Sequence, residues 1–109
     1  MEIVFQNHDA PMSDNMRRRA EQALRKVARR ANRAVDGVIR FQQDGTMRRV
    51  ELTMHTGDGR RYVASADGRY FGSALSDAAR KLAMQVIHTK RTRKARARKL
   101  SRRSTPRSR

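Results

Sequence analysis

Cysteine is absent from this 109-residue chain, which excludes disulfide bonds and metal sites built on thiolates. Aromatic residues make up only 5% of the chain, so it can bury one modest hydrophobic core. No apolar run approaches the roughly 18 residues that a membrane-spanning helix needs. The first nine residues are acidic and lack a long apolar run, unlike a secretory signal. We therefore expect a cytoplasmic protein with no membrane partner.

Acidic residues are also scarce: ten Asp and Glu stand against 27 Lys and Arg, and the formal net charge is +17. Eleven of the basic residues lie between Lys90 and Arg109, a segment without any acidic residue. Residues 1–89 hold the other sixteen basic residues and all ten acids, a surplus of six. Both parts of the chain are therefore basic, and this charge favours binding to a polyanion through release of counterions.

The hydrophobic pattern predicts four strands and two helices. Turn signals at Asp44-Gly45 and Gly57-Asp58-Gly59 separate the last three strands. The expected strands span residues 2–7, 38–43, 47–56 and 60–66. The order β-α-β-β-β-α predicts an α+β fold of two layers, a four-stranded mixed sheet with both helices on one face. A right-handed first crossover makes the first two strands parallel and the remaining pairs antiparallel.

The two faces of this sheet are expected to differ in polarity. Alternation places apolar side chains on the inner face: Ile39 and Phe41; Val50, Leu52 and Met54; Tyr62, Ala64 and Ala66. The other face should be in contact with water and carries Arg40, Gln42, Glu51, Thr53 and Arg61.

The first helix is expected from about Asp14 to Asn32, with Ser13 as its N-cap. Its apolar stripe consists of Met16, Ala20, Ala23, Leu24, Val27 and Ala31. Its outer face carries Arg18, Gln22, Arg25, Lys26, Arg29 and Arg33. Like charges four residues apart, such as Arg25 and Arg29, cost a few tenths of a kcal/mol. A helix selected for stability alone would avoid them, so this basic face indicates function.

The second helix is expected from near Tyr70 to Lys99. Its apolar stripe consists of Leu75, Ala78, Ala79, Leu82 and Val86. Its opposite side carries Asp77, Arg80, Lys81, Met84, His88 and Arg91. We expect one α+β domain over residues 1–91 and a basic tail over residues 92–109. Phosphates that neutralise the tail could prolong the helix to about Leu100, and the Ser-, Pro- and Arg-rich segment beyond Ser101 is typical of disorder.

No residue pattern indicates an enzyme, a cofactor or a metal site. His8, His55 and His88 each lack a second ligand at a spacing that metal sites use. Gly57-Asp58-Gly59 resembles part of a phosphate-binding loop, but no helix follows it, and a hairpin turn is the simpler interpretation. The four serines near the helices have no base placed beside them by the sequence. We therefore expect a binding protein without a small-molecule substrate.

The few aromatic residues also bear on how nucleic acid could be bound. Proteins that read single strands on a sheet surface stack bases on exposed aromatic side chains of adjacent strands. Phe5, Phe41 and Tyr62 are all expected in the core. This leaves recognition of the phosphate backbone and of RNA shape by two basic helices.

Two stretches resemble the short form of the bacterial ribosome hibernation-promoting and ribosome-associated inhibitor factors. The first matches their capped, basic first helix through Ser13, Met16, Arg17 and Leu24-Arg25-Lys26-Val27. The second matches their Ala-Ser-Ala strand end and Lys-Leu helix motif through Ala64-Ser65-Ala66, Lys81-Leu82, Gln85 and Lys90. The resemblance covers residues 1–95 and includes the order of the strands and helices.

The resemblance implies a protein that binds rRNA of the small ribosomal subunit in the channel for mRNA and tRNA, blocks initiation and protects idle ribosomes. Matching positions imply that Arg17, Lys26, Lys81, Gln85 and Lys90 contact rRNA. The arrangement of charges on the helix faces adds Arg18, Arg25, Arg29, Arg33, Arg80, His88, Arg91, Arg93 and Lys94. Residues 1–91 would then form a ribosome-binding domain, monomeric off the ribosome.

Two other functions also fit the composition. A general double-stranded RNA or nucleic-acid-binding module would bind any duplex, with an affinity set by phosphate number and salt. A structural ribosomal or phage-like assembly protein would use the arginine-rich tail as an anchor and would be stoichiometric in growing-cell ribosomes. Preference for the ribosome over other RNA distinguishes the hibernation factor from the general module.

Overall fold

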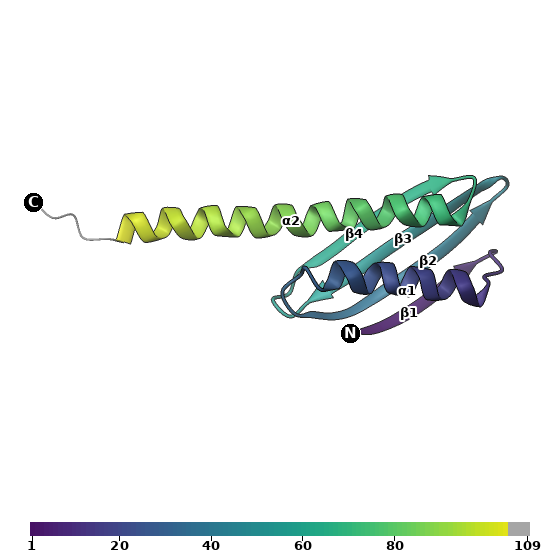
Figure 1. The fold of residues 1–109 in the computed structure, drawn as a ribbon, viewed down its shortest axis with the longest axis horizontal. Helices are drawn as coiled ribbons and strands as arrows, with labels where there is room; N and C mark the ends of the chain where they lie inside the picture. The colour runs from purple at the N-terminus through teal and green to yellow at the C-terminus, as the bar shows by residue number, and fades with distance from the viewer. Residues whose placement is uncertain (105–109) are drawn as a thin grey trace, which may run out of the picture.

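The computed structural model describes residues 1–104 of the chain, and the surroundings of side chains up to residue 99. The element order is β-α-β-β-β-α, as the sequence predicts. The elements are β1 (Glu2–His8), α1 (Asp14–Ala28), β2 (Ala34–Asp44), β3 (Met47–Thr56), β4 (Arg61–Gly68) and α2 (Phe71–Ser104). Figure 1 shows α1 and the first part of α2 lying along the sheet, and the rest of α2 extending past the sheet.

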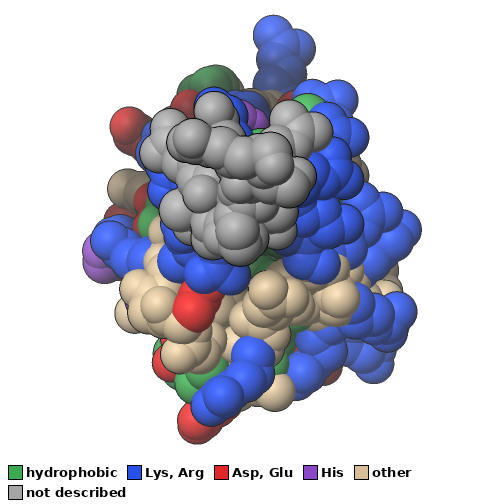
Figure 2. All heavy atoms as spheres, turned by 90° about the vertical axis from the view of Figure 1, so that its left-hand side faces the viewer, with side chains coloured by type: hydrophobic (Ala, Val, Ile, Leu, Met, Phe, Trp, Pro, Cys, Tyr) green, Lys and Arg blue, Asp and Glu red, His purple; other side chains and the backbone are tan. Residues whose placement is uncertain are grey.

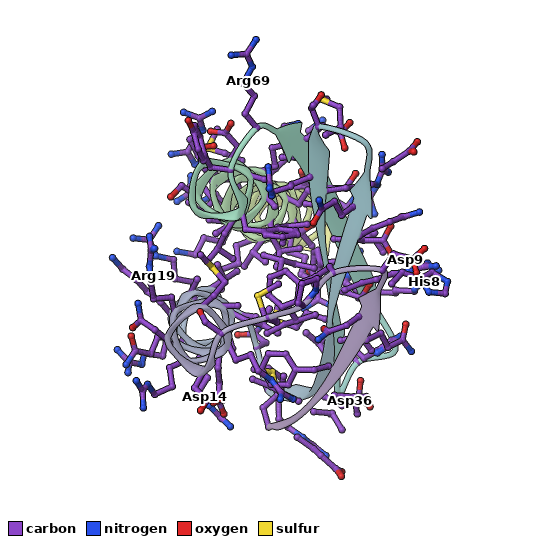
Figure 3. All side chains as sticks on the ribbon, turned by 90° about the vertical axis from the view of Figure 1, so that its right-hand side faces the viewer. His8, Asp9, Asp14, Arg19, Asp36 and Arg69 are labelled. Atoms are coloured by element: carbon purple, nitrogen blue, oxygen red, sulfur yellow. The ribbon has the colours of Figure 1, made fainter. Side chains whose placement is uncertain are left out.

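The four strands form one mixed sheet in the order β1-β2-β3-β4. β1 runs parallel to β2, and the β2–β3 and β3–β4 pairs are antiparallel, which confirms the predicted topology. β1 and β4 are thus the two edge strands. Both helices cover the same face of the sheet, as the view along the sheet in Figure 3 shows. The fold is the predicted α+β arrangement of two layers.

The core lies between the helices and the inner face of the sheet. Ile39 and Phe41 on β2 are fully buried there, and Phe41 packs edge-on against Phe71 at a ring-centroid distance of 5.5 Å. The other buried apolar residues of strands and helices are Ala20, Leu24, Val27, Val50, Leu52, Met54, Ala64, Ala66, Ala74, Leu75, Ala78, Leu82 and Val86. Most of the apolar stripe predicted for each helix is therefore buried in this core, whereas Ala31, predicted in the first stripe, lies beyond the end of α1.

The first helix begins as predicted but ends four residues early. Ser13 caps it by accepting a hydrogen bond from the Met16 N–H at 3.1 Å. It ends at Ala28 rather than Asn32, because β2 begins already at Ala34 and the chain must turn first. Arg33 makes that turn with a positive φ of 56°, a conformation outside the helix. The prediction that Arg33 lies on the helix surface is therefore wrong.

Thr53 was expected in water on the open face of the sheet, but only 6% of its surface is exposed. It lies between Val38 on β2 and Val63 on β4, directly opposite both in the strand pairing. Val4 of β1 extends the same row. Neighbouring branched side chains thus cover the threonine, an effect that alternation along one strand does not reveal.

The second helix is longer than predicted. It begins at Phe71, one residue from the expected start, and continues to Ser104. Residues 101–104 are therefore helical, whereas the sequence led us to expect disorder beyond Ser101. Arg102 and Arg103 are good helix formers, and no Gly or Pro interrupts the chain from Ser73 to Thr105. The boundary between domain and tail at residue 92 stays a prediction, and the part of the tail at 105–109 lies outside the described residues.

Candidate nucleic-acid interface

Positive charge gathers on the helix side of the molecule. α2 contains eleven Lys and Arg and one acidic residue, Asp77. α1 contains four Arg and one Lys, with Asp14 and Glu21 as its only acids. In Figure 2, which looks at the end where α2 projects, most Lys and Arg side chains lie on the right, the side of the two helices. A phosphate-rich partner would be attracted to this side.

The open face of the sheet carries charges of both signs in close pairs. Arg49 on β3 lies 3.6 Å from the Asp67 carboxylate on β4. The His55 ring nitrogen Nδ1 lies 2.5 Å from Asp36 Oδ1 on β2. The charges on this face therefore largely offset one another, and the excess positive charge belongs to the helix side.

A groove of about 530 Å³ runs between α1 and α2 on the helix side. Its cations come from both sides: Arg19, Lys26 and Arg30 from α1 and the turn after it, and Arg80 from α2. Its apolar lining consists of Ala23, Val27, Leu75, Ala79 and Ala83. Most of these apolar side chains are small, which leaves room for a chain of phosphates between the three cations of the α1 side and Arg80 of α2. We call these four cations the groove cations.

Arg19 and Arg30 are groove residues that are not among the cations predicted from the sequence. Arg19 points away from α1 into solvent in Figure 3, and its Nη1 lies 3.5 Å from the position that a Cβ on Gly72 would take. Arg19 thus reaches the first turn of α2. The signal was present in the sequence, because Arg19 and Lys26 are seven residues apart and share one side of a helix. Arg30 follows the end of α1, and only the tertiary structure places it.

The other predicted cations of α1 lie outside the groove. Arg18 and Arg29 are exposed. Arg25 binds Glu21 at 2.9 Å and donates to the Met1 carbonyl at 3.2 Å, toward β1. The Arg17 guanidinium lies 4.8 Å from the centre of the Phe5 ring, a cation–π contact on the same flank. The predicted α1 residues therefore divide between the groove, the outer surface and the β1 flank.

Lys81 and Gln85 of α2 lie against the sheet edge. Lys81 Nζ donates to the Ser65 carbonyl at 3.1 Å, and Gln85 Nε2 donates to the Val63 carbonyl at 2.6 Å. Both acceptors belong to β4, an edge strand whose outer carbonyls would otherwise face water. At about 100° per residue, these two side chains leave α2 roughly opposite the groove. These two hydrogen bonds help to hold α2 on the sheet.

Arg93 connects α2 to the turn between β3 and β4. Its guanidinium forms an ion pair with Asp58, and Arg60 Nε lies 3.5 Å from the same carboxylate. The pKa of the Asp58 carboxyl is lowered mainly by the hydrogen bond that the Thr56 hydroxyl donates to it. The Arg60 N–H and the Arg93 guanidinium lower this pKa further. Asp58 therefore remains ionised and holds Arg93 in place at neutral pH.

The remaining predicted residues lie along the outer side of α2 or near the β3–β4 turn. His88, Arg91 and Lys94 are exposed, and Lys90 is half-buried. The Arg33 side chain lies over the β3–β4 turn, because its Nε is 2.8 Å from the position that a Cβ on Gly57 would take. The structure thus brings Lys26 and Arg80 into one groove and distributes the others around it.

Within residues 1–104, no cluster of three His, Cys, Asp or Glu residues could hold a metal ion. No helix in the described part of the chain is long and apolar enough to cross a membrane.

Residues 3–94 match the model of one protein family, described as sigma 54 modulation protein / S30EA ribosomal protein. The chain belongs to this family. Membership confirms the resemblance seen in the sequence and makes the chain a member of a ribosome-associated family. Comparison with curated protein sequences gives no match.

Two solved structures illustrate the shared fold. A ribosomal subunit interface protein from Coxiella burnetii superimposes with a TM-score of 0.73 at 17% identity, covering 83% of this chain and 98% of that one. The N-terminal domain of Thermus thermophilus Protein Y superimposes with a TM-score of 0.72 at 18% identity, covering 82% of this chain and 99% of that one. At such identities the match shows the fold alone.

Proposed function

We propose that this protein binds rRNA of the small ribosomal subunit in the channel that mRNA and tRNA use, and so keeps an idle ribosome from initiating. It acts without catalysis, by shape and charge. The groove between α1 and α2 supports this proposal most directly, because three cations of the α1 side lie across a lining of mostly small apolar side chains from Arg80 of α2. Family membership supplies the ribosome as the polyanion.

In this proposal the groove cations carry the strongest contacts, since each can donate to a phosphate oxygen from a fixed position on the fold. Arg18 on α1 and Arg29 at its C-cap, with His88, Arg91 and Lys94 on α2, extend the contact over the outer surface. Lys81, Gln85 and Arg93 serve the attachment of α2 as well, since they already bind β4 or the β3–β4 turn. Their share in rRNA binding is therefore smaller than the sequence alone suggested.

The test is binding of the purified chain to isolated small ribosomal subunits at about 0.2 M salt, where weak multi-phosphate contacts are reduced by orders of magnitude. One competitor is excess duplex RNA, and the other is a leaderless mRNA with initiator tRNA. We expect displacement by mRNA with tRNA and little displacement by duplex RNA. Equal displacement by any RNA would overturn the proposal in favour of a general RNA-binding module.

A further inference from the structure

The end of α2 leaves the domain as a projecting helical arm. Within the described residues, the Arg93–Asp58 ion pair is the last recorded side-chain contact between α2 and the domain. Residues 94–99 are all exposed, and the helix continues to Ser104. We call residues 94–104 the arm; at about 1.5 Å per residue it reaches roughly 16 Å. Figure 1 shows it clear of the sheet, and the molecule is accordingly 69 Å long and 24 Å wide.

The distribution of charge around α2 changes where the arm begins. Inside the domain one side of α2 is apolar, with Leu82 and Val86 buried. At about 100° per residue, Arg96 falls on that same side, where the apolar stripe would continue. Lys94 and Arg98 lie on the same side of α2 as the groove. Lys99 lies near Arg96, on the side of Lys81 that faces away from the groove. The arm therefore carries positive charge on opposite sides rather than along one.

A helix of this kind needs a partner that surrounds it with negative charge. Lys90, Lys94 and Arg98 repeat at four-residue intervals, a like-charge pattern that destabilises an isolated helix. The apolar residues of the arm are Ala95, Ala97 and a single larger one, Leu100, so the arm lacks the apolar face that binds a membrane surface or a partner helix. A flat anionic surface would neutralise the positive charge on only one side of the arm. A crevice between RNA segments satisfies both.

We propose that the arm inserts between two RNA segments and contacts phosphates on opposite sides at once, a second binding site beyond the groove. This inference rests on the proposed function, which supplies rRNA as the folded RNA. It differs from a simple continuation of the groove surface, because that would use Lys94 and Arg98 and leave Arg96 and Lys99 in water.

Two matched variants of the full chain separate these arrangements. Lys94→Gln with Arg98→Gln removes two charges from the groove side, and Arg96→Gln with Lys99→Gln removes two from the other side. All four positions are exposed and lie outside the core, and Gln is a good helix former, so the thermal midpoint should not change. The measurement is affinity for isolated small ribosomal subunits at several salt concentrations.

We expect both variants to weaken binding similarly, by about tenfold at 0.2 M salt, and to lower the slope of log affinity against log salt by about 1.4 to 1.8 each. A loss confined to the Lys94/Arg98 variant would overturn the inference, because the arm would then lie against one surface. Wild-type affinity in both variants would overturn it too. If the wild-type chain itself does not bind the subunit, the proposed function fails, and the inference with it.

Discussion

The helix side and the open face of the sheet handle charge in opposite ways. On the open face, Arg49 faces Asp67 and His55 faces Asp36 across neighbouring strands. On the helix side, four cations line one groove. Within the described residues, the only acid bound to any of them is Asp77, which lies 3.3 Å from Arg80. Paired charges keep a sheet surface soluble. Cations held together with so few acids repel one another in the free protein, and they become stabilising only when an anion is bound. We propose that the paired charges serve the fold and that the groove cations serve binding.

The largest expected effect tests this separation directly. Lys26→Gln with Arg80→Gln removes two groove cations, and Arg40→Gln with Arg61→Gln removes two cations from the open face. We expect the groove variant to bind small ribosomal subunits about ten- to a hundredfold more weakly, because two phosphate contacts are lost. The open-face variant should bind within about threefold of wild type. Equal losses in the two variants would show that net charge, rather than its placement, determines binding.

A smaller effect distinguishes the two flanks of α2. Gln85→Ala removes the hydrogen bond to the Val63 carbonyl and should lower the free energy of unfolding by about 0.5 to 1.5 kcal/mol. Met84→Ala is the matched control, since Met84 is 62% exposed on the outer side and should change stability little. Denaturant unfolding measures both, and ribosomal affinity should stay within about threefold of wild type. A large loss of affinity with unchanged stability in Gln85→Ala would return this residue to the binding surface.

The smallest effect concerns the junction where α2 meets the β3–β4 turn. The pKa of Asp58 is lowered from 3.8 by its contacts with Thr56, Arg60 and Arg93. A carboxyl whose pKa is lower in the folded state adds stability above its unfolded pKa, and that stability is lost as the pH falls through the folded value. We expect Asp58→Asn to flatten the dependence of unfolding free energy on pH below about pH 4. Identical pH profiles for the variant and the wild type would contradict this.

Much of the fold could be predicted because it depends on local patterns. The alternation of Val50, Leu52 and Met54 and the helical spacing of Leu75, Leu82 and Val86 identify inner faces without any knowledge of the neighbouring elements. Thr53 and Arg33 were misplaced for the opposite reason. Burial of Thr53 depends on the valines of two other strands, and the turn at Arg33 depends on where β2 begins. No single segment contains that information.

The candidate site was predicted less completely than the fold. The sequence identified basic helix surfaces, and Lys26 and Arg80 among them do lie in the groove. It missed Arg19 and Arg30, which matter only because α1 and α2 lie side by side. The family resemblance implies rRNA contacts for Lys81 and Gln85, which stay a prediction, while nothing in the helix pattern shows that the edge of β4 accepts their hydrogen bonds.

Local patterns in the chain are enough to predict which elements form, which side of each helix is buried, and that the molecule carries a large excess of positive charge. Which of those charges come together depends on how the elements pack. Helical periodicity gives the direction of a side chain around its own axis, but the distance between side chains of two helices follows from how both pack on the sheet. For this reason Arg80 became a groove cation while Lys81, its neighbour in the chain, became a contact of the sheet edge.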